Sequence, residues 1–204
     1  MSPTESDHTE PKVTLWLDPV CPFSWNTARW LRAVAEATGS AIDWQLMSLA
    51  ALNEGRDLTP AQQARMRDSQ QVGRLMAALA RDHGPAGWVD AYFAFGERYF
   101  ERSEPIDANL VAHVLMTVGA RGATAAAVSD TSLDGFIRHQ HQAGQEALGE
   151  TGGSPILRIG KHAFFGPVLT ALPDAEAGTA LFDAVATLAA TPQFAQLQRP
   201  RSRA

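Results

Sequence analysis

The segment from residue 13 to residue 47 constrains the fold most, because its periodicity changes twice. Apolar and other residues alternate over 13–17 and again over 42–46, which is the period of a strand. Between them, apolar residues recur at helical spacing over 24–38, and Gly39 supplies a helix C-terminal stop. Strand, helix and strand in this order predict two parallel strands joined by a right-handed crossover.

Cys21, the only cysteine of the chain, lies at the predicted turn from the first strand to the helix. Pro22 suits the first helical position, where an amide would have no intrahelical partner. A thiol beside a helix N-terminus should have a lowered pKa, and the thiolate is the nucleophile. A single cysteine is often just a small buried hydrophobe, but this context favours a reactive one. Asp18 either tunes the thiol or forms an exposed salt bridge or a turn hydrogen bond.

Composition fits a globular protein and narrows the function classes. The 204 residues are 45% hydrophobic and 19% charged, with a formal net charge of -5, which gives no support to nucleic-acid binding. Residues 2–12 lack the apolar core of a secretory signal, and no run is long enough to cross a membrane. One cysteine excludes an internal disulfide. We therefore expect a cytoplasmic protein without membrane contact.

After the second strand the pattern becomes helical over residues 59–150. Thr59 and Gln62 have the spacing of a capping box around Pro60. The strand pattern returns in a hairpin over 155–165, with a turn at Gly160-Lys161, and a last helix follows over 175–190. We expect a tail at 1–11, an α/β domain made of 12–58 and 151–192, a helical insertion at 59–150, and a C-terminal tail at 193–204.

Five separated stretches resemble a known family. The chain as a whole resembles the DsbA-like branch of the thioredoxin superfamily, in which a helical subdomain is inserted into a thioredoxin-like α/β fold. More closely, it resembles the actinobacterial mycothiol-dependent nitroreductases. This resemblance implies a cytoplasmic oxidoreductase with a nucleophilic cysteine, mycothiol or another small thiol as cosubstrate, and no tightly bound cofactor. The stretches are Asp18-Pro19-Val20-Cys21-Pro22, Arg29-Trp30, Met47-Ser48-Leu49-Ala50, Leu52-Asn53-Glu54 and Phe164-Phe165-Gly166-Pro167-Val168-Leu169.

The resemblance also implies site residues. Gly153-Ser154-Pro155 matches the family's cis-proline loop, in which the residue before proline offers its backbone beside the reactive sulfur. The implied contacts to substrate or thiol come from Pro22, Phe23, Asn53, Ser154 and Pro155. No metal site is expected, because His139 and His141 are two apart on a predicted helix and point in different directions.

The chain departs from the family pattern at Ser24. The family has Cys-Pro-x-Cys, whereas this chain has Cys21-Pro22-Phe23-Ser24. Serine cannot form a disulfide, so a two-cysteine cycle is excluded and a monothiol route remains, in which a second small thiol resolves the intermediate. Ser24 either donates a hydrogen bond to a thiolate, as serine does in kappa-class glutathione transferases, or simply faces the first helical turn.

Three functions follow from these residues. The first is a monothiol oxidoreductase that uses Cys21 and a small thiol, by the resemblance mycothiol, to reduce disulfide, mixed-disulfide or nitro substrates. The second is a kappa-like thiol transferase or isomerase in which Ser24 handles the thiolate. The third is a non-catalytic binding protein with a thioredoxin fold. The sequence leaves open the electrophile, the small thiol and whether the chain forms a homodimer.

Overall fold

A computed structural model describes residues 12–200, so the expected tail at 1–11 lies outside the described residues. The centre is one four-stranded sheet with the order β2-β1-β3-β4. β1 pairs in parallel with β2 and antiparallel with β3, and β3 and β4 form the expected hairpin. The strands are β1 (Val13–Leu17), β2 (Ile42–Leu46), β3 (Ile156–Ile159) and β4 (His162–Phe165).

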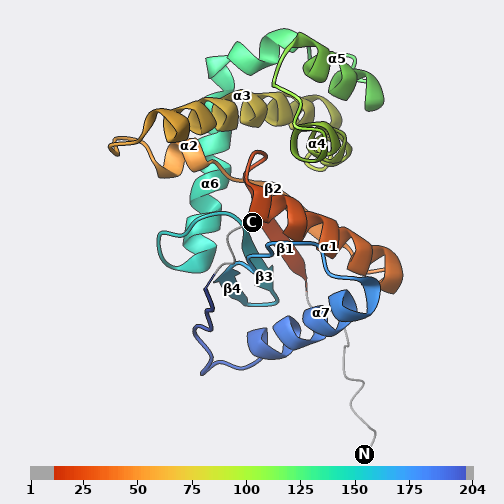
Figure 1. Cartoon of the computed structure of the whole chain (residues 1–204), viewed down its shortest axis with the longest axis vertical. Helices are drawn as coiled ribbons and strands as arrows, with labels where there is room; N and C mark the ends of the chain where they lie inside the picture. Colours follow the sequence, from red (N-terminus) through yellow and green to blue (C-terminus); the bar gives the residue numbers. More distant parts are fainter. Residues whose placement is uncertain (1–11, 201–204) are drawn as a thin grey trace, which may run out of the picture.

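Helices cover both faces of the sheet, and the inserted segment forms a helical cap above it (Figure 1). α1 and α7 pack against each other on one side, whereas α6 runs down from the cap and contacts β2, β3 and β4 on the other. The helices are α1 (Pro22–Thr38), α2 (Leu49–Leu52), α3 (Pro60–His83), α4 (Val89–Gly96), a π-helix (Glu97–Glu101), α5 (Ala108–Thr117), 3-10 turns (Ala125–Ser129 and Thr131–Leu133), α6 (Asp134–Leu148) and α7 (Ala175–Ala189).

Short-range signals in the sequence set the ends of several elements. Gly39 ends α1 in the left-handed conformation, with φ of 74°, and its N–H bonds back to the helix. Thr59 and Gln62 form the predicted capping box at the start of α3. Asp107 and Asp174 accept backbone N–H groups at the starts of α5 and α7.

The two faces of β1 are buried in different clusters. Val13, Leu15 and Leu17 belong to the main core shared with α1 and the insertion. Trp16 points to the opposite face, where it packs with Met47 and Ile156 in a smaller cluster that includes residues of α6. Both faces of β1 are covered, which explains why the strand is apolar almost throughout. This packing fixes the carboxyl end of β1, from which the chain leads to Cys21.

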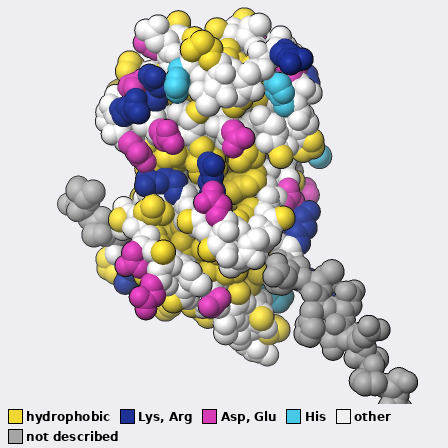
Figure 2. Space-filling model, turned by 90° about the vertical axis from the view of Figure 1, so that its right-hand side faces the viewer, with side chains coloured by type: hydrophobic (Ala, Val, Ile, Leu, Met, Phe, Trp, Pro, Cys, Tyr) yellow, Lys and Arg dark blue, Asp and Glu magenta, His cyan; other side chains and the backbone are white. Residues whose placement is uncertain are grey.

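The insertion contacts α1, the helix that begins directly after Cys21, through an aromatic cluster. Trp25 of α1 stacks on Phe100 of the π-helix and meets Tyr92 of α4 edge-on, with ring centroids 5.6 and 5.7 Å apart. Gly96 allows this packing, since a Cβ there would lie 2.3 Å from Trp25 Cζ3. Figure 2 shows hydrophobic side chains gathered across the middle of one face of the molecule. Helix α1 is thus fixed by the insertion as well as by the sheet.

An ion pair joins two helices of the insertion. The Arg74 guanidinium of α3 donates two hydrogen bonds, of 2.7 and 2.8 Å, to the Asp134 carboxylate at the start of α6. These bonds lower the pKa of Asp134 and raise that of Arg74. The paired geometry positions α6, which descends to the sheet.

Candidate active site

Cys21 is the residue that precedes helix α1 and follows the end of β1. Its carbonyl accepts the N–H of Trp25 at 3.0 Å, so Cys21 is the N-cap residue, and Pro22 occupies the first turn as predicted. The side chain is only 4% exposed. The half-buried Pro22 and Phe23 lie beside it in sequence at the start of the helix.

The loop before β3 meets the cysteine. The Ser154–Pro155 peptide bond is cis, which confirms that prediction, and a second cis bond at Gly166–Pro167 was not predicted. Cys21 Sγ donates to the carbonyl oxygen of Ser154 at 3.4 Å. The structure thus brings residues 21 and 154 together, with the backbone of Ser154 beside the sulfur.

Ser24 faces both the cysteine and the cis-proline loop. It is fully buried, and its hydroxyl forms a hydrogen bond with Cys21. Ser24 Oγ also lies 2.5 Å from Ser154 Oγ, which in turn accepts the backbone N–H of Asp18 at 2.8 Å. The Ser24 hydroxyl is thus held between the cysteine and the cis-proline loop, and its donation to a thiolate stays a prediction.

Asp18 is a buried acid and not part of an exposed salt bridge, so that alternative was wrong. One carboxylate oxygen accepts the N–H of Val20 at 2.9 Å, the predicted turn hydrogen bond. The other accepts the N–H of Leu49 at 2.7 Å and the hydroxyl of Ser69 at 2.5 Å. Burial raises the pKa of Asp18 despite these donors. Ser69 comes from α3, and no local pattern in the sequence pointed to it.

The expected lowering of the Cys21 pKa was wrong in direction. Burial raises the pKa of the thiol above its ordinary value, and the charge of Asp18 adds to that effect. The Ser24 hydroxyl and the backbone N–H groups of Ser24 and Phe23 stabilise the thiolate, but burial outweighs them. The sequence indicated the helix N-terminus correctly but not the depth at which the sulfur lies.

Asn53, a predicted contact to substrate or thiol, ends α2. Its side-chain amide donates to the carbonyl of Leu49 at 2.8 Å and contacts Met66 Sδ at 3.6 Å. The neighbouring Glu54 carboxylate pairs with the Arg138 guanidinium, which lowers the pKa of Glu54. Asn53 is thus held by its own helix α2 and by Met66 of α3, whereas Glu54 is held by α6, and a role of Asn53 in binding stays a prediction.

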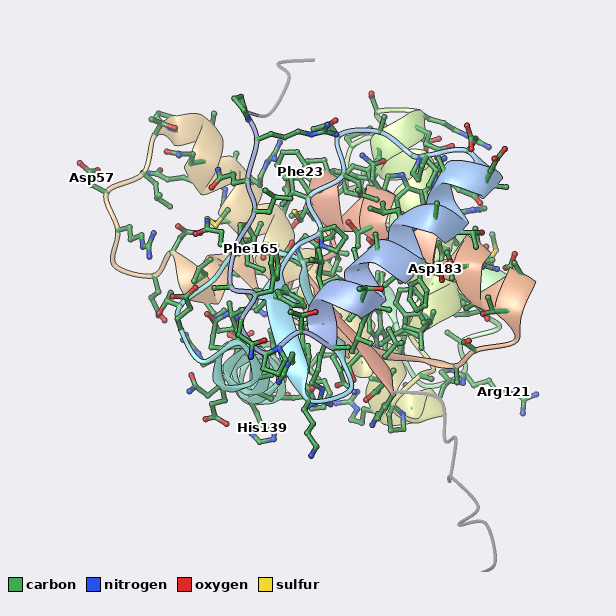
Figure 3. The ribbon with its side chains drawn as sticks, turned by 90° about the horizontal axis from the view of Figure 1, so that it is seen from below. Phe23, Asp57, Arg121, His139, Phe165 and Asp183 are labelled. Carbon is green, nitrogen blue, oxygen red and sulfur yellow. The ribbon has the colours of Figure 1, made fainter. Side chains whose placement is uncertain are left out.

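An aromatic ring that the sequence did not assign to the site lies against the cis-proline loop. A Cβ on Gly153 would lie 3.1 Å from the ring of Phe165, so the ring covers the backbone just before Ser154. Phe165 is 44% exposed. Figure 3 shows Phe165 and Phe23 toward the middle of the view from below, whereas Asp57 lies at its edge.

Two other features, a membrane-spanning helix and a metal-binding cluster, are absent from the described residues. Over residues 12–200 no helix is long and apolar enough to span a membrane. In the same part of the chain, no group of three or more His, Cys, Asp or Glu residues could hold a metal ion.

A cysteine at the start of the first helix, a cis-proline loop beside its sulfur and a helical insertion define a thioredoxin-like protein of the DsbA-like class, and comparison with known proteins agrees. The family described as Rv2466c-like, mycothiol-dependent nitroreductase Rv2466c, matches residues 20–199. The chain belongs to this family of thiol-dependent oxidoreductases. An uncharacterised protein of Mycobacterium tuberculosis, Rv2286c, is 29% identical over 193 residues, which are 93% of this chain and 82% of that protein.

Solved structures agree on the fold. A 2-hydroxychromene-2-carboxylate isomerase has a TM-score of 0.58 at 18% identity, covering 86% of this chain and 95% of that one. The cytosolic disulfide reductase DsbM of Pseudomonas aeruginosa, solved with GSH, has a TM-score of 0.57 at 13% identity, covering 85% and 98%. The predicted thioredoxin-like fold with a helical insertion is confirmed.

Proposed function

We propose that the chain is a monothiol oxidoreductase in which Cys21 is the nucleophile and mycothiol is the reducing cosubstrate. The observation that carries the proposal is the position of the sulfur. It lies at the N-terminus of α1, 3.4 Å from the Ser154 carbonyl, with hydrogen-bond donors from Ser24 and Phe23. Those donors stabilise a thiolate and the partial negative charge on sulfur during thiol–disulfide exchange. Membership of the family supports mycothiol as the small thiol.

The reaction needs two exchanges because the chain has one cysteine. The Cys21 thiolate attacks the mycothiol sulfur of a mixed disulfide, so a Cys21–mycothiol disulfide forms and the other thiol leaves and takes up a proton. A second mycothiol, as its thiolate, then attacks the mycothiol sulfur of that adduct. Cys21 is released as thiolate and oxidised mycothiol forms. In the net reaction, one mixed disulfide and one mycothiol are converted into the free thiol of the substrate and one molecule of oxidised mycothiol.

The raised pKa of Cys21 has two consequences for this cycle. A thiolate of higher pKa is a stronger nucleophile but is present in a smaller fraction at neutral pH, so the rate of attack rises with pH. The same sulfur is a poorer leaving group in the second exchange. With Ser24 in place of a resolving cysteine, the adduct therefore persists until a second thiol arrives.

Nitro compounds are a further substrate class that family membership supports. Two mycothiol molecules supply two electrons and two protons and become one disulfide, while a nitro group becomes a nitroso group and releases water. The exposed ring of Phe165 beside the cis-proline loop offers an apolar surface for an aromatic substrate.

Turnover of a mixed disulfide between mycothiol and a peptide tests the proposal. We expect Cys21→Ser to abolish turnover and adduct formation, and Ser24→Ala to slow both while retaining them. If Ser24→Ala abolished turnover and Cys21→Ser retained it, the kappa-like transferase or isomerase would replace this proposal. A wild-type protein that neither turns over nor forms an adduct would be a binding protein.

A further inference from the structure

Two buried hydroxyl groups form a chain of hydrogen bonds that ends at the reactive sulfur. Ser24 is 0% exposed and Ser154 is 5% exposed, and their Oγ atoms lie 2.5 Å apart. The Ser24 hydroxyl also bonds to Cys21. At the other end, the backbone N–H of Asp18 reaches Ser154 Oγ at 2.8 Å. The two contacts of Ser154 Oγ join residues that are 130 and 136 positions apart in the sequence.

Either hydroxyl can donate across the contact between Ser24 and Ser154, and the backbone amide of Asp18 favours one of the two directions. An amide N–H can only donate, so Ser154 Oγ accepts from Asp18 and keeps its own proton for donation. The hydroxyl oxygen in reach of that proton is Ser24 Oγ. Once Ser24 accepts from Ser154, its own proton points to Cys21, so each proton has an acceptor. If Ser24 donated to Ser154 instead, the Ser24 proton would point away from Cys21 and the lone pairs of Ser24 Oγ would face the sulfur.

We infer that the Ser154 hydroxyl is a positioning group that orients the Ser24 hydroxyl to donate to the sulfur of Cys21. This role differs from that of the Ser154 backbone, whose carbonyl accepts from the Cys21 thiol at 3.4 Å. The carbonyl favours the protonated sulfur, whereas the hydroxyl, acting through Ser24, favours the thiolate. The inference rests on the proposed function only in taking Cys21 as the nucleophile.

The rate of alkylation by iodoacetamide as a function of pH measures the effect, because the chain has one cysteine to react. Ser154→Ala should raise the Cys21 pKa by about one unit, so alkylation at a fixed pH below that pKa slows about tenfold. In a Ser24→Ala background the same substitution should change the rate less than about twofold, because the group through which it acts is absent. Ser154→Thr keeps a hydroxyl and should restore most of the wild-type profile.

Thr27→Val is the matched control. It removes a buried hydroxyl of α1 that donates to the carbonyls of Phe23 and Pro167 and has no part in the chain to sulfur, so the Cys21 pKa should stay at its wild-type value. The inference is overturned if Ser154→Ala leaves the profile unchanged, or slows alkylation equally with and without Ser24. Adduct formation with oxidised mycothiol is scored separately, so its absence in the wild type would refute the proposed function and leave the titration result standing.

Discussion

Replacing Gly96 with alanine would place a methyl group 2.3 Å from Cζ3 of Trp25 and 2.6 Å from Cη2. Carbon atoms in contact normally lie about 3.5–4.0 Å apart, so the ring or the helix must move by more than about 1 Å. The Trp25 ring cannot move easily, because it is 4% exposed and stacks on Phe100. Gly96 already has helical φ and ψ of -63° and -37°, so the backbone itself tolerates alanine.

The magnitude follows from two opposing effects. Overpacking a rigid core costs up to about 3 kcal/mol. Replacing a glycine within a helix by alanine stabilises the folded state by up to about 1 kcal/mol. We expect Gly96→Ala to lower the free energy of unfolding by about 2 kcal/mol, measured by urea denaturation. It should also alter Cys21 alkylation, since Trp25 lies on the first turns of the helix that carries the cysteine.

Gly73 in α3 provides the control. A Cβ there would lie 3.6 Å from Ile137 Cδ1, an ordinary contact, so Gly73→Ala should stabilise the protein by about 0.5–1 kcal/mol. A Gly96→Ala protein as stable as wild type, or a Gly73→Ala protein destabilised as much as Gly96→Ala, would refute this account of how the insertion packs on α1.

Three further substitutions test the charges and hydroxyls described above. Asp18→Asn removes a charge that raises the Cys21 pKa, so the pH profile of alkylation should move to lower pH, and an unchanged profile would argue against that interaction. Tyr92→Phe removes a buried hydroxyl that has no hydrogen-bond partner among residues 12–200, so thermal unfolding should show no loss of stability, and a loss above about 1 kcal/mol would reveal a partner. Asp134 has a folded pKa below its ordinary 3.8, so the stability contributed by Arg74 is present above pH 3.8 and lost as pH falls through the lower folded value. The difference in unfolding free energy between wild type and Arg74→Gln should therefore shrink in that acid range, and a constant difference would contradict the pairing.

Much of the fold could be predicted because its signals are local. The capping box at Thr59, the C-terminal stop at Gly39 and the turn at Gly160 each depend on a few neighbouring residues, and the structure has all three. The position of Cys21 at a helix start follows from the same kind of pattern, and so does the hairpin.

The site itself depends on contacts that no local pattern shows. Ser69 reaches Asp18 across 51 positions, and Ser24 reaches Ser154 across 130. The direction of the Cys21 pKa shift was wrong for the same reason, because burial of the thiol is a property of the packed molecule. Periodicity predicts which residues begin a helix, but not how deeply the rest of the folded chain buries them.

Decay of the Cys21–mycothiol adduct tests the central claim most directly. The isolated adduct, followed by intact mass, should persist without free thiol and disappear at a rate proportional to the concentration of added mycothiol, because the chain has no second cysteine to resolve it. Each adduct lost should yield one molecule of oxidised mycothiol. Failure of the adduct to form, or its decay at the same rate whether or not mycothiol is added, would contradict the monothiol cycle.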